Sequence, residues 1–332
     1  MARIAINGLG RIGRATLKII EDTPDLDLVA VNDLVPADTL AYLLKYDSVY
    51  GRYQKDVKAE KDSLSIDGRT VKVLSEKDPT QLPWKDMNVD IVIESTGLFT
   101  EEEGAKKHIT AGAKHVIISA PTKSKSVRTV VHGVNEAPND EHVIISCASC
   151  TTNSITPPVE IIGRHIGIKK AMLTTVHAYT STQSLVDSPS KKLRRGRAAA
   201  VSIIPSSTGA AVATTEVLPE HQGKFDGTSL RVPTPVGSIS DITFVTERPT
   251  SAEEVNKIMR EEAKSDKYKG IMAVSEDEIV SSDVIQDPHA SVIDLTGTMV
   301  VDGDLLKVMA WYDNEWGYSN QMVREALNIL SR

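Results

Sequence analysis

Near the N-terminus the chain reads Arg3-Ile4-Ala5-Ile6-Asn7-Gly8-Leu9-Gly10-Arg11-Ile12-Gly13. The apolar run that ends at Asn7 predicts a strand, and the residues after the glycines have the apolar spacing of an amphipathic helix. The pattern Gly8-x-Gly10-x-x-Gly13 permits a tight turn, a close approach of the backbone to a pyrophosphate, and close packing of helix on strand. About 20 residues later Asp33 ends a second predicted strand, where a carboxylate can accept a hydrogen bond from a ribose hydroxyl. These features predict a dinucleotide site, and NAD is favoured over NADP because Asp33 would repel a 2′-phosphate.

The order of the later segments predicts the fold class. Strands are expected at 26–31, 89–93, 115–119 and 143–146 with helical stretches between them, an alternation typical of a parallel sheet. A hairpin is expected at 64–73, because Asp67-Gly68 suits a tight primed turn. After about residue 150, β-type runs follow one another, which predicts a mostly antiparallel sheet with helices on one face. We therefore expect an α/β protein with a doubly wound Rossmann domain at 1–149, an α+β catalytic and oligomerisation domain at 150–315, and a C-terminal helix within 316–332.

Composition excludes several classes of protein. The length of 332 residues corresponds to roughly two domains, and a net charge of −7 argues against a general nucleic-acid binder. No segment reaches the roughly 18 apolar residues that span a bilayer, and the N-terminus does not resemble a signal peptide. The two cysteines, Cys147 and Cys150, are too few for a disulfide scaffold. We expect a soluble cytoplasmic protein.

Cys150 is a candidate nucleophile. It lies among small polar residues that favour a helix N-terminus, yet a helix end supplies only about 0.3–1 kcal/mol of the roughly 3–4 kcal/mol needed to lower a thiol pKa by two or three units. An imidazolium about 4 Å away contributes up to roughly 4 kcal/mol, so a histidine partner is needed. His177, at the end of the apolar run 172–176, is the leading candidate among eight histidines. The alternatives are a surface histidine, a cysteine that only fills the core, and a redox pair in Cys147-x-x-Cys150.

Six motifs distributed over the whole chain resemble those of the phosphorylating glyceraldehyde-3-phosphate dehydrogenase family. They are 6–14 (INGLGRIGR), 148–153 (ASCTTN), 175–180 (TVHAYT), 208–211 (TGAA), 231–234 (RVPT) and 311–319 (WYDNEWGYS). The resemblance implies the glycolytic and gluconeogenic oxidation of D-glyceraldehyde 3-phosphate with NAD and inorganic phosphate to 1,3-bisphosphoglycerate, through a thiohemiacetal and a thioester. It also implies a homotetramer and a closing helix that returns to the NAD-binding domain.

The same resemblance implies a role for each matching residue. Cys150 would be the nucleophile and His177 its base. Two anion sites, for the substrate's phosphate and for inorganic phosphate, would be formed by Ser149, Thr151, Thr180, Arg195, Thr208, Gly209 and Arg231. The cofactor would be bound by Gly8, Gly10, Arg11, Ile12, Gly13, Asp33, Lys77, Thr96 and Ser119, and its nicotinamide positioned by Asn314 and Tyr318. No metal site is expected.

Some residues depart from the family pattern. Cys147 occupies a position where asparagine is common, and we expect it to be a small buried hydrophobe. Pro157-Pro158 lies inside the helix expected after Cys150 and predicts a kink or a late helix start, because an interior proline costs about 3 kcal/mol. Ser188 hints at tolerance of NADP. The basic run 191–197 is read as an interface loop that supports substrate anions, with RNA binding as the alternative.

Three other functions are alternatives to the oxidation of glyceraldehyde 3-phosphate. Erythrose-4-phosphate dehydrogenase has a similar motif set, with a thioester that water attacks. A cysteine hydrolase would use Cys150 and His177 but needs no dinucleotide turn. A nucleotide sensor would need the turn but not Cys150.

Overall fold

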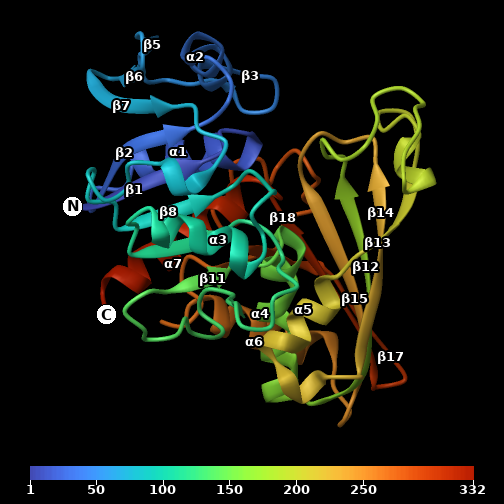
Figure 1. The fold of residues 1–332 in the computed structure, drawn as a ribbon. Helices are drawn as coiled ribbons and strands as arrows, with labels where there is room; N and C mark the ends of the chain where they lie inside the picture. Colours follow the sequence, from blue (N-terminus) through green and yellow to red (C-terminus); the bar gives the residue numbers. More distant parts are fainter. The chain divides into compact units, whose positions relative to one another are not determined.

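The computed structural model describes residues 1–332 (Figure 1). The chain divides into two compact units. The first unit comprises residues 1–130, 136–148 and 322–332, and the second comprises residues 131–135 and 149–321. Each unit has its own sheet. The predicted fold class is confirmed, since one sheet is mostly parallel and the other mostly antiparallel.

The first unit contains a nine-stranded sheet in the order β10-β11-β9-β8-β1-β2-β7-β6-β5. Its strands are β1 (Ala2–Asn7), β2 (Leu26–Asn32), β5 (Val57–Ala59), β6 (Ser63–Ile66), β7 (Arg69–Leu74), β8 (Ile91–Glu94), β9 (His115–Ile118), β10 (Arg128–Thr129) and β11 (Ile144–Ser146). The pairs β5–β6 and β6–β7 are antiparallel, and all other neighbouring strands are parallel. The predicted hairpin is present between β6 and β7, and Asp67 and Gly68 both have positive φ, as a primed turn requires.

Helices α1 (Arg11–Glu21), α2 (Ala37–Lys45) and α3 (Glu102–Thr110) accompany this sheet, together with a short pair of strands, β3 (Tyr46–Asp47) and β4 (Gly51–Arg52). Strand β1 lies between β2 and β8, so the chain winds to one side of β1 first and to the other side later. At such a switch point the loops that follow neighbouring strands separate and leave a crevice beyond the carboxyl ends of the strands. The turn Gly8–Gly10 connects β1 to α1 at this edge.

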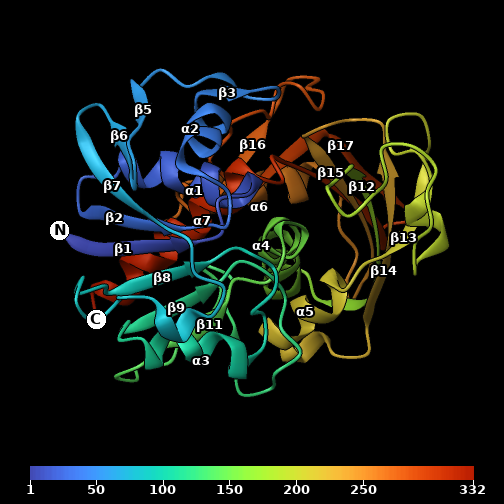
Figure 2. The same cartoon turned by 45° about the horizontal axis from the view of Figure 1, so that its top comes forward.

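The second unit contains a seven-stranded sheet in the order β13-β14-β12-β15-β18-β17-β16. Its strands are β12 (Ile168–Ala178), β13 (Ile204–Ser207), β14 (Phe225–Val232), β15 (Ser238–Thr246), β16 (Met272–Ser275), β17 (Ser291–Val301) and β18 (Leu305–Tyr312). The pairs β12–β14 and β16–β17 are parallel and the other neighbours are antiparallel. Helices α4 (Cys150–His165), α5 (Ala210–Val217) and α6 (Ala252–Ala263) lie on one side of β12, β14 and β15 in both views of the ribbon (Figures 1 and 2).

Apolar residues of these three helices and of the sheet form one buried cluster in the second unit, which includes Ile155, Phe244 and Met259. Burial alternates strictly along β15, because successive side chains of a strand point to opposite faces. The closing helix α7 (Trp316–Leu330) crosses the division, with residues 316–321 in the second unit and 322–330 in the first.

The late start that was one of two possibilities for helix α4 is wrong. The helix begins at Cys150, without the late start that Pro157-Pro158 suggested, and it is continuous through both prolines to His165. Residues 151–159 are all buried, so the packing of this segment offsets the loss of the backbone hydrogen bonds that the prolines cannot donate.

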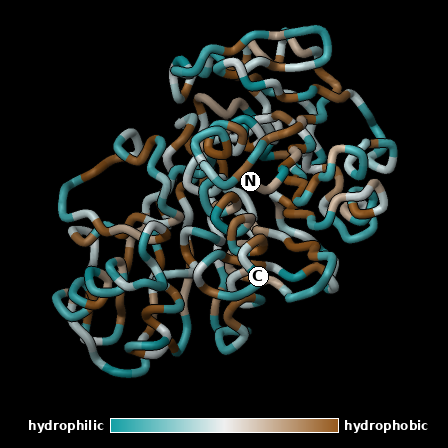
Figure 3. Tube along the Cα trace, turned by 90° about the vertical axis from the view of Figure 1, so that its left-hand side faces the viewer, coloured by the Kyte–Doolittle hydropathy of each residue, from teal (hydrophilic) through white to brown (hydrophobic).

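Hydrophobic and hydrophilic residues are interspersed along the whole chain trace (Figure 3). Among the helices, none combines the length and the apolar character that a bilayer crossing requires.

Candidate active site

Cys150 and His177, the predicted catalytic pair, lie together in the second unit. Ser149 caps helix α4, because its Oγ accepts a hydrogen bond from the backbone N–H of Thr152 at 3.1 Å, and Cys150 is the first residue of that helix. His177 lies one residue before the end of β12. Cys150 Sγ is 3.3 Å from His177 Nε2. The side chains are therefore close enough for a proton to pass between sulfur and imidazole.

The other ring nitrogen of His177 has two close neighbours. Nδ1 lies 2.7 Å from the carbonyl oxygen of Ala178 and 2.7 Å from Nη1 of Arg231, which itself donates to that carbonyl at 2.9 Å. The parallel pairing of β12 with β14 sets His177 directly opposite Arg231. The tautomer decides which of the two contacts of Nδ1 is a hydrogen bond. With the ring proton on Nδ1 the imidazole donates to the Ala178 carbonyl and the lone pair of Nε2 can accept the thiol proton, whereas with the proton on Nε2 the Nδ1 atom accepts from Arg231.

Burial and Arg231 together control protonation of the pair. They lower the pKa of His177 to about 3, since burial and the adjacent guanidinium both oppose an imidazolium. Burial raises the pKa of Cys150, and the positive charge of Arg231 partly offsets that rise. Burial therefore opposes a charge on either residue, whereas the positive charge of Arg231 favours a thiolate on Cys150 and opposes an imidazolium on His177.

Beneath this pair a hydroxyl cluster fixes Thr151. Its Oγ1 lies 2.9 Å from the hydroxyl of Tyr312, which is also 2.9 Å from Oγ1 of Thr175. The Tyr312 ring meets the imidazole of His177 edge to face, with centroids 6.0 Å apart. Tyr312 was not among the residues singled out from sequence, although the motif that contains it was.

The remaining expected anion ligands fall into two groups. Thr180 Oγ1 lies 2.9 Å from Oγ1 of Thr182, to which Arg195 Nη1 donates at 3.1 Å, so Thr180 and Arg195 share one neighbour. Thr208 and Gly209 lie at the start of α5, where Thr208 Oγ1 accepts from the N–H of Ala210 at 3.1 Å.

A cavity of about 510 Å³ lies in the first unit at the carboxyl ends of β1, β2 and β8. Five expected cofactor residues line it: Gly8, Gly10, Asp33, Lys77 and Thr96. Sequence reasoning missed the others, which are Asn7, Asn32, Leu34, Glu76, Ser95, Leu98 and Phe99. Several of these directly end or follow a strand, so their position at the sheet edge was the available signal.

The turn at this cavity has the features that a dinucleotide pyrophosphate needs. Gly8 has φ +91°, a conformation that side chains disfavour. A Cβ on Gly13 would lie 2.1 Å from the carbonyl oxygen of Gly8, so only glycine lets helix and strand approach this closely. Asp33 Oδ2 accepts a hydrogen bond from the N–H of Leu9 at 2.7 Å and so holds the turn. These residues fit NAD.

Six expected cofactor residues lie outside the lining of this cavity. Arg11 is engaged elsewhere, with Nη1 2.6 Å from Asp47 Oδ2, and Ile12 and Gly13 lie in helix α1. The N–H of Ser119 donates to the Glu94 carbonyl at 2.9 Å. Asn314 and Tyr318 belong to the second unit, where Asn314 Oδ1 accepts from Ser238 Oγ at 3.0 Å and Tyr318 is buried in α7.

Comparisons with known proteins identify a family for both parts of the chain. Residues 2–102 match the family model for the NAD binding domain of glyceraldehyde 3-phosphate dehydrogenase, and residues 149–314 match the model for its C-terminal domain. Curated proteins named glyceraldehyde-3-phosphate dehydrogenase are similar over nearly their whole length. The protein from Thermotoga maritima is 53% identical over 333 residues (99% of each chain). Those from Geobacillus stearothermophilus (99% of this chain, 98% of the relative) and Streptomyces coelicolor (97% and 96%) are each 48% identical.

Proposed function

The chain belongs to the glyceraldehyde-3-phosphate dehydrogenase family, and from this premise we propose how its residues oxidise D-glyceraldehyde 3-phosphate with NAD and inorganic phosphate to 1,3-bisphosphoglycerate. The observation that carries the proposal is the 3.3 Å separation of Cys150 Sγ and His177 Nε2 at the start of helix α4. A thiol and a base at this distance supply both the nucleophile and the proton acceptor that an aldehyde requires.

Cys150 and His177 carry the covalent steps. As Sγ attacks the aldehyde carbon, Nε2 takes the thiol proton and passes it to the former carbonyl oxygen, so the product is a thiohemiacetal on Cys150 and His177 is again neutral. His177 then takes the hydroxyl proton of the thiohemiacetal, and this leaves a thioester when the carbon loses its hydrogen as hydride. When bound, NAD supplies the hydride acceptor. An oxygen of inorganic phosphate attacks the thioester carbon, the acyl phosphate leaves, and the sulfur is released.

Arg231 couples anion binding to the strength of this base. An anion about 4 Å from a charge interacts by about 4 kcal/mol at an effective dielectric of 20, equivalent to about three pKa units. A phosphate dianion bound at Arg231 would offset the guanidinium that now lowers the pKa of His177. His177 would thereby become a usable base only when substrate or phosphate is present. Ser149, Thr151, Thr180, Arg195, Thr208 and Gly209 complete the two proposed anion sites.

The first unit holds the cofactor in this proposal. Backbone N–H groups of the Gly8–Gly13 turn bind the pyrophosphate, Asp33 accepts from the ribose hydroxyl, and Lys77 and Thr96 line the remaining wall. Arg11, Ile12 and Ser119 flank the site, and Asn314 and Tyr318 position the nicotinamide. We retain residues 1–149 as the NAD-binding domain, 150–315 as the catalytic domain, and 316–332 as the returning helix.

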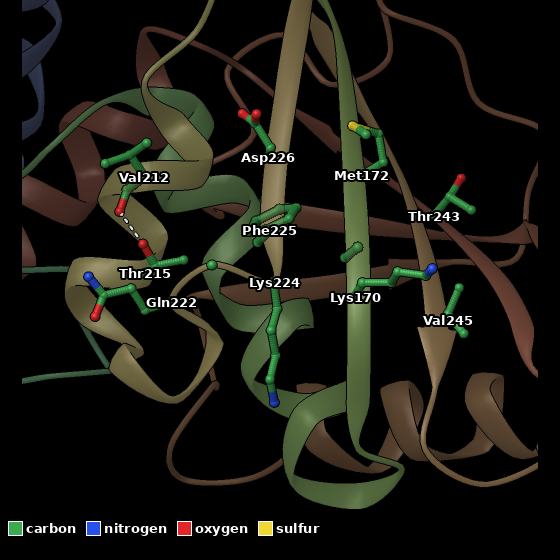
Figure 4. A pocket seen from close by; sticks show the side chains of 12 residues that line it. Lys170, Met172, Val212, Thr215, Gln222, Lys224, Phe225, Asp226, Thr243 and Val245 are labelled. Carbon is green, nitrogen blue, oxygen red and sulfur yellow. Dashed lines mark hydrogen bonds between the residues drawn. The ribbon is translucent and has the colours of Figure 1, made fainter.

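A homotetramer is the proposed assembly, supported by exposed apolar residues of the second unit, on helix α5 and on the face of the sheet that helices α4–α6 leave uncovered. Met172 on β12 and Val212 on α5 are 59% and 58% exposed beside a groove of about 710 Å³ (Figure 4). Further exposed apolar residues lie on β17 and β18: Met299, Val301 and Leu305. A second copy of the chain could remove this apolar area from water. A cytoplasmic location is proposed as well, because a nucleophilic thiol must stay reduced.

Production of NADH from glyceraldehyde 3-phosphate, with and without inorganic phosphate, tests the function. We expect absorbance at the NADH band to grow at a rate that depends on phosphate, and to vanish in Cys150→Ala. Activity with erythrose 4-phosphate that phosphate does not stimulate would favour the erythrose-4-phosphate reaction instead.

A further inference from the structure

A buried carboxylate adjoins the cavity in the first unit without lining it. Glu94, the last residue of β8, is only 1% exposed. Its Oε1 accepts hydrogen bonds from the backbone N–H of Thr96 at 2.8 Å and from the Thr96 hydroxyl. Its Oε2 accepts from Asn7 Nδ2 at 2.5 Å and lies 3.1 Å from His108 Nε2. Four donors therefore converge on one carboxylate, and two of the three residues that supply them, Asn7 and Thr96, line the cavity.

His108 can donate to Glu94 in only one way. Its Nδ1 lies 3.1 Å from Nε1 of Trp84, and an indole N–H is a donor with no acceptor capacity. Nδ1 must then be the accepting nitrogen, which puts the ring proton on Nε2 and aims it at Glu94. Trp84 and His108 are both fully buried, so no water replaces either partner. The indole thus fixes the tautomer of the imidazole.

The chain of hydrogen bonds has the same fixed direction on its other side. Asn7 donates to Glu94, so its Oδ1 accepts from Asn32 Nδ2 at 2.7 Å. Asn32 Nδ2 also donates to the carbonyl of Glu76 at 2.9 Å, and its Oδ1 accepts from the N–H of Glu76 at 2.8 Å. The network thereby ties the ends of β1, β2 and β8 to the segment that follows β7. All of these segments contribute to the cavity wall.

We propose that Glu94 is a positioning residue for the dinucleotide pocket, acting as the all-acceptor group on which donors of Asn7, His108 and Thr96 converge. The proposal deepens the proposed function, on which it rests, because the cavity is taken to be the NAD site. Depending on the orientation of its amide, a glutamine at position 94 would place its NH₂ group either against the N–H of Thr96 or against the donors of Asn7 and His108. Neither of these last two donors can reverse: Trp84 blocks the other tautomer of His108, and Asn32 blocks a flip of the Asn7 amide. An unsatisfied buried donor would displace the wall of the pocket.

Substitution of Glu94 in the full chain tests this. For Glu94→Gln we expect the Kd and the KM for NAD to rise at least tenfold, with kcat at saturating NAD within about threefold of wild type and the KM for glyceraldehyde 3-phosphate unchanged. Calorimetric titration with NAD and steady-state kinetics give these values. The matched control is Glu103→Gln, an exposed carboxylate on α3, which should leave all of them unchanged.

Trp84→Phe provides a second test at a residue that does not line the cavity. Loss of the indole donor lets His108 adopt either tautomer, so Trp84→Phe alone should raise the Kd for NAD about threefold. In Glu94→Gln/Trp84→Phe the freed imidazole can accept from the glutamine NH₂, so the double variant should bind NAD at least threefold more tightly than Glu94→Gln. A role in stability alone would instead make the double variant worse than either single one.

The outcomes separate this proposal from the function on which it rests. Failure of the wild-type chain to bind NAD would overturn both. Wild-type binding with an unchanged Kd in a folded Glu94→Gln, checked by circular dichroism, would overturn the positioning role alone. If Glu94→Gln does not fold, an unchanged Kd in Trp84→Phe overturns the proposal and a rise of threefold or more supports it.

Discussion

Nη1 of Arg231 lies 2.7 Å from Nδ1 of His177, the imidazole whose Nε2 is 3.3 Å from Cys150 Sγ. The parallel register of β12 and β14 brings these side chains together, although 54 residues separate them in sequence. A fixed positive charge beside a catalytic imidazole works against its protonation, so the base is weakest before an anion arrives. In the proposed reaction this relationship gives Arg231 a part in the acid–base chemistry, in addition to its proposed role as an anion ligand.

Arg231→Gln should therefore have two separable effects. Loss of the dianion contact lowers kcat/KM for glyceraldehyde 3-phosphate by about 10²–10³-fold, as expected when a charged hydrogen bond is removed. Burial is the larger cause of the low pKa of His177 and remains, but loss of the charge removes the second cause, so this pKa should rise part of the way from about 3 toward its ordinary value of about 6.5. The first effect is measured by steady-state kinetics. The second is measured by NMR titration of ring-labelled histidine in a Cys150→Ala background, which removes the coupled thiol.

Arg231→Lys is the control for charge. It keeps a cation at the position and should leave the pKa of His177 low, while kcat/KM still falls because an ammonium lacks the planar fork of the guanidinium. A His177 pKa that stays near 3 in Arg231→Gln would show that burial alone lowers it and that the charge of Arg231 does not contribute.

The sequence predicted the pair Cys150 and His177 but not the protonation state of that pair. Polar residues after an apolar run marked the position of His177, and small polar residues marked the helix start at Cys150. The guanidinium beside His177 depends on the pairing of β12 with β14, which no local pattern reveals. Arg231 was indicated only by the resemblance to a family, and only as an anion ligand. The expectation of an imidazolium at His177 therefore did not take the positive charge of Arg231 into account.

The pocket in the first unit shows the same limit. The glycines and Asp33 were predicted from local turn chemistry, and Gly8, Gly10 and Asp33 line the cavity. The network of Glu94, Asn7 and His108 joins residues 14 to 101 positions apart, and its function depends on burial and on the direction of each donor. Neither spacing nor composition contains that information. The prolines of α4 did not delay the start of the helix for a related reason, because tertiary packing outweighed a local penalty.

Asp33 has two roles that substitution can separate. Asp33→Asn keeps an oxygen to accept from the N–H of Leu9 but removes the charge, so kcat/KM with NADP should rise about 10-fold while that with NAD falls only a few-fold. Asp33→Ala also loses the contact to the turn, so it should impair the reaction with both cofactors. Kinetics with NAD and NADP on the three proteins provide the comparison. Equal kcat/KM for the two cofactors in wild type would contradict the predicted preference for NAD.

Glu160 should stabilise the second unit in a pH-dependent way. Hydrogen bonds from Arg164, Lys267 and Tyr268 outweigh burial and lower the pKa of this carboxylate to about 2 from an ordinary 4.5. A carboxylate with a depressed pKa contributes its full stability above about pH 4.5 and loses it as the pH falls toward 2. Glu160→Gln should thus lower the free energy of unfolding by about 1–2 kcal/mol at pH 7, after allowance for solvent screening of its partly exposed partners.

Urea unfolding at pH 7 and at several values below 4.5 measures this difference. The difference in the free energy of unfolding between wild type and Glu160→Gln should decrease steadily below pH 4.5. Glu278→Gln removes an exposed carboxylate and should show no such difference. A difference that stays constant down to pH 3 would show that Glu160 acts through packing and not through its charge.

Gly10 and Gly13 should respond differently to alanine, although both belong to the same motif. A Cβ at Gly13 would meet the Gly8 carbonyl oxygen at 2.1 Å, so Gly13→Ala must push α1 away from β1 and should cost about 1–3 kcal/mol of stability. A Cβ at Gly10 meets no atom within 4 Å, and the φ of −69° suits any residue, so Gly10→Ala should fold with wild-type stability.

If the turn binds a pyrophosphate through its backbone, a methyl group at Gly10 would occupy the space that the ligand needs. Gly10→Ala should then raise the Kd for NAD at least tenfold while its thermal unfolding midpoint stays unchanged. A Gly10→Ala protein that binds NAD as tightly as wild type would mean that the pyrophosphate lies elsewhere than against this turn.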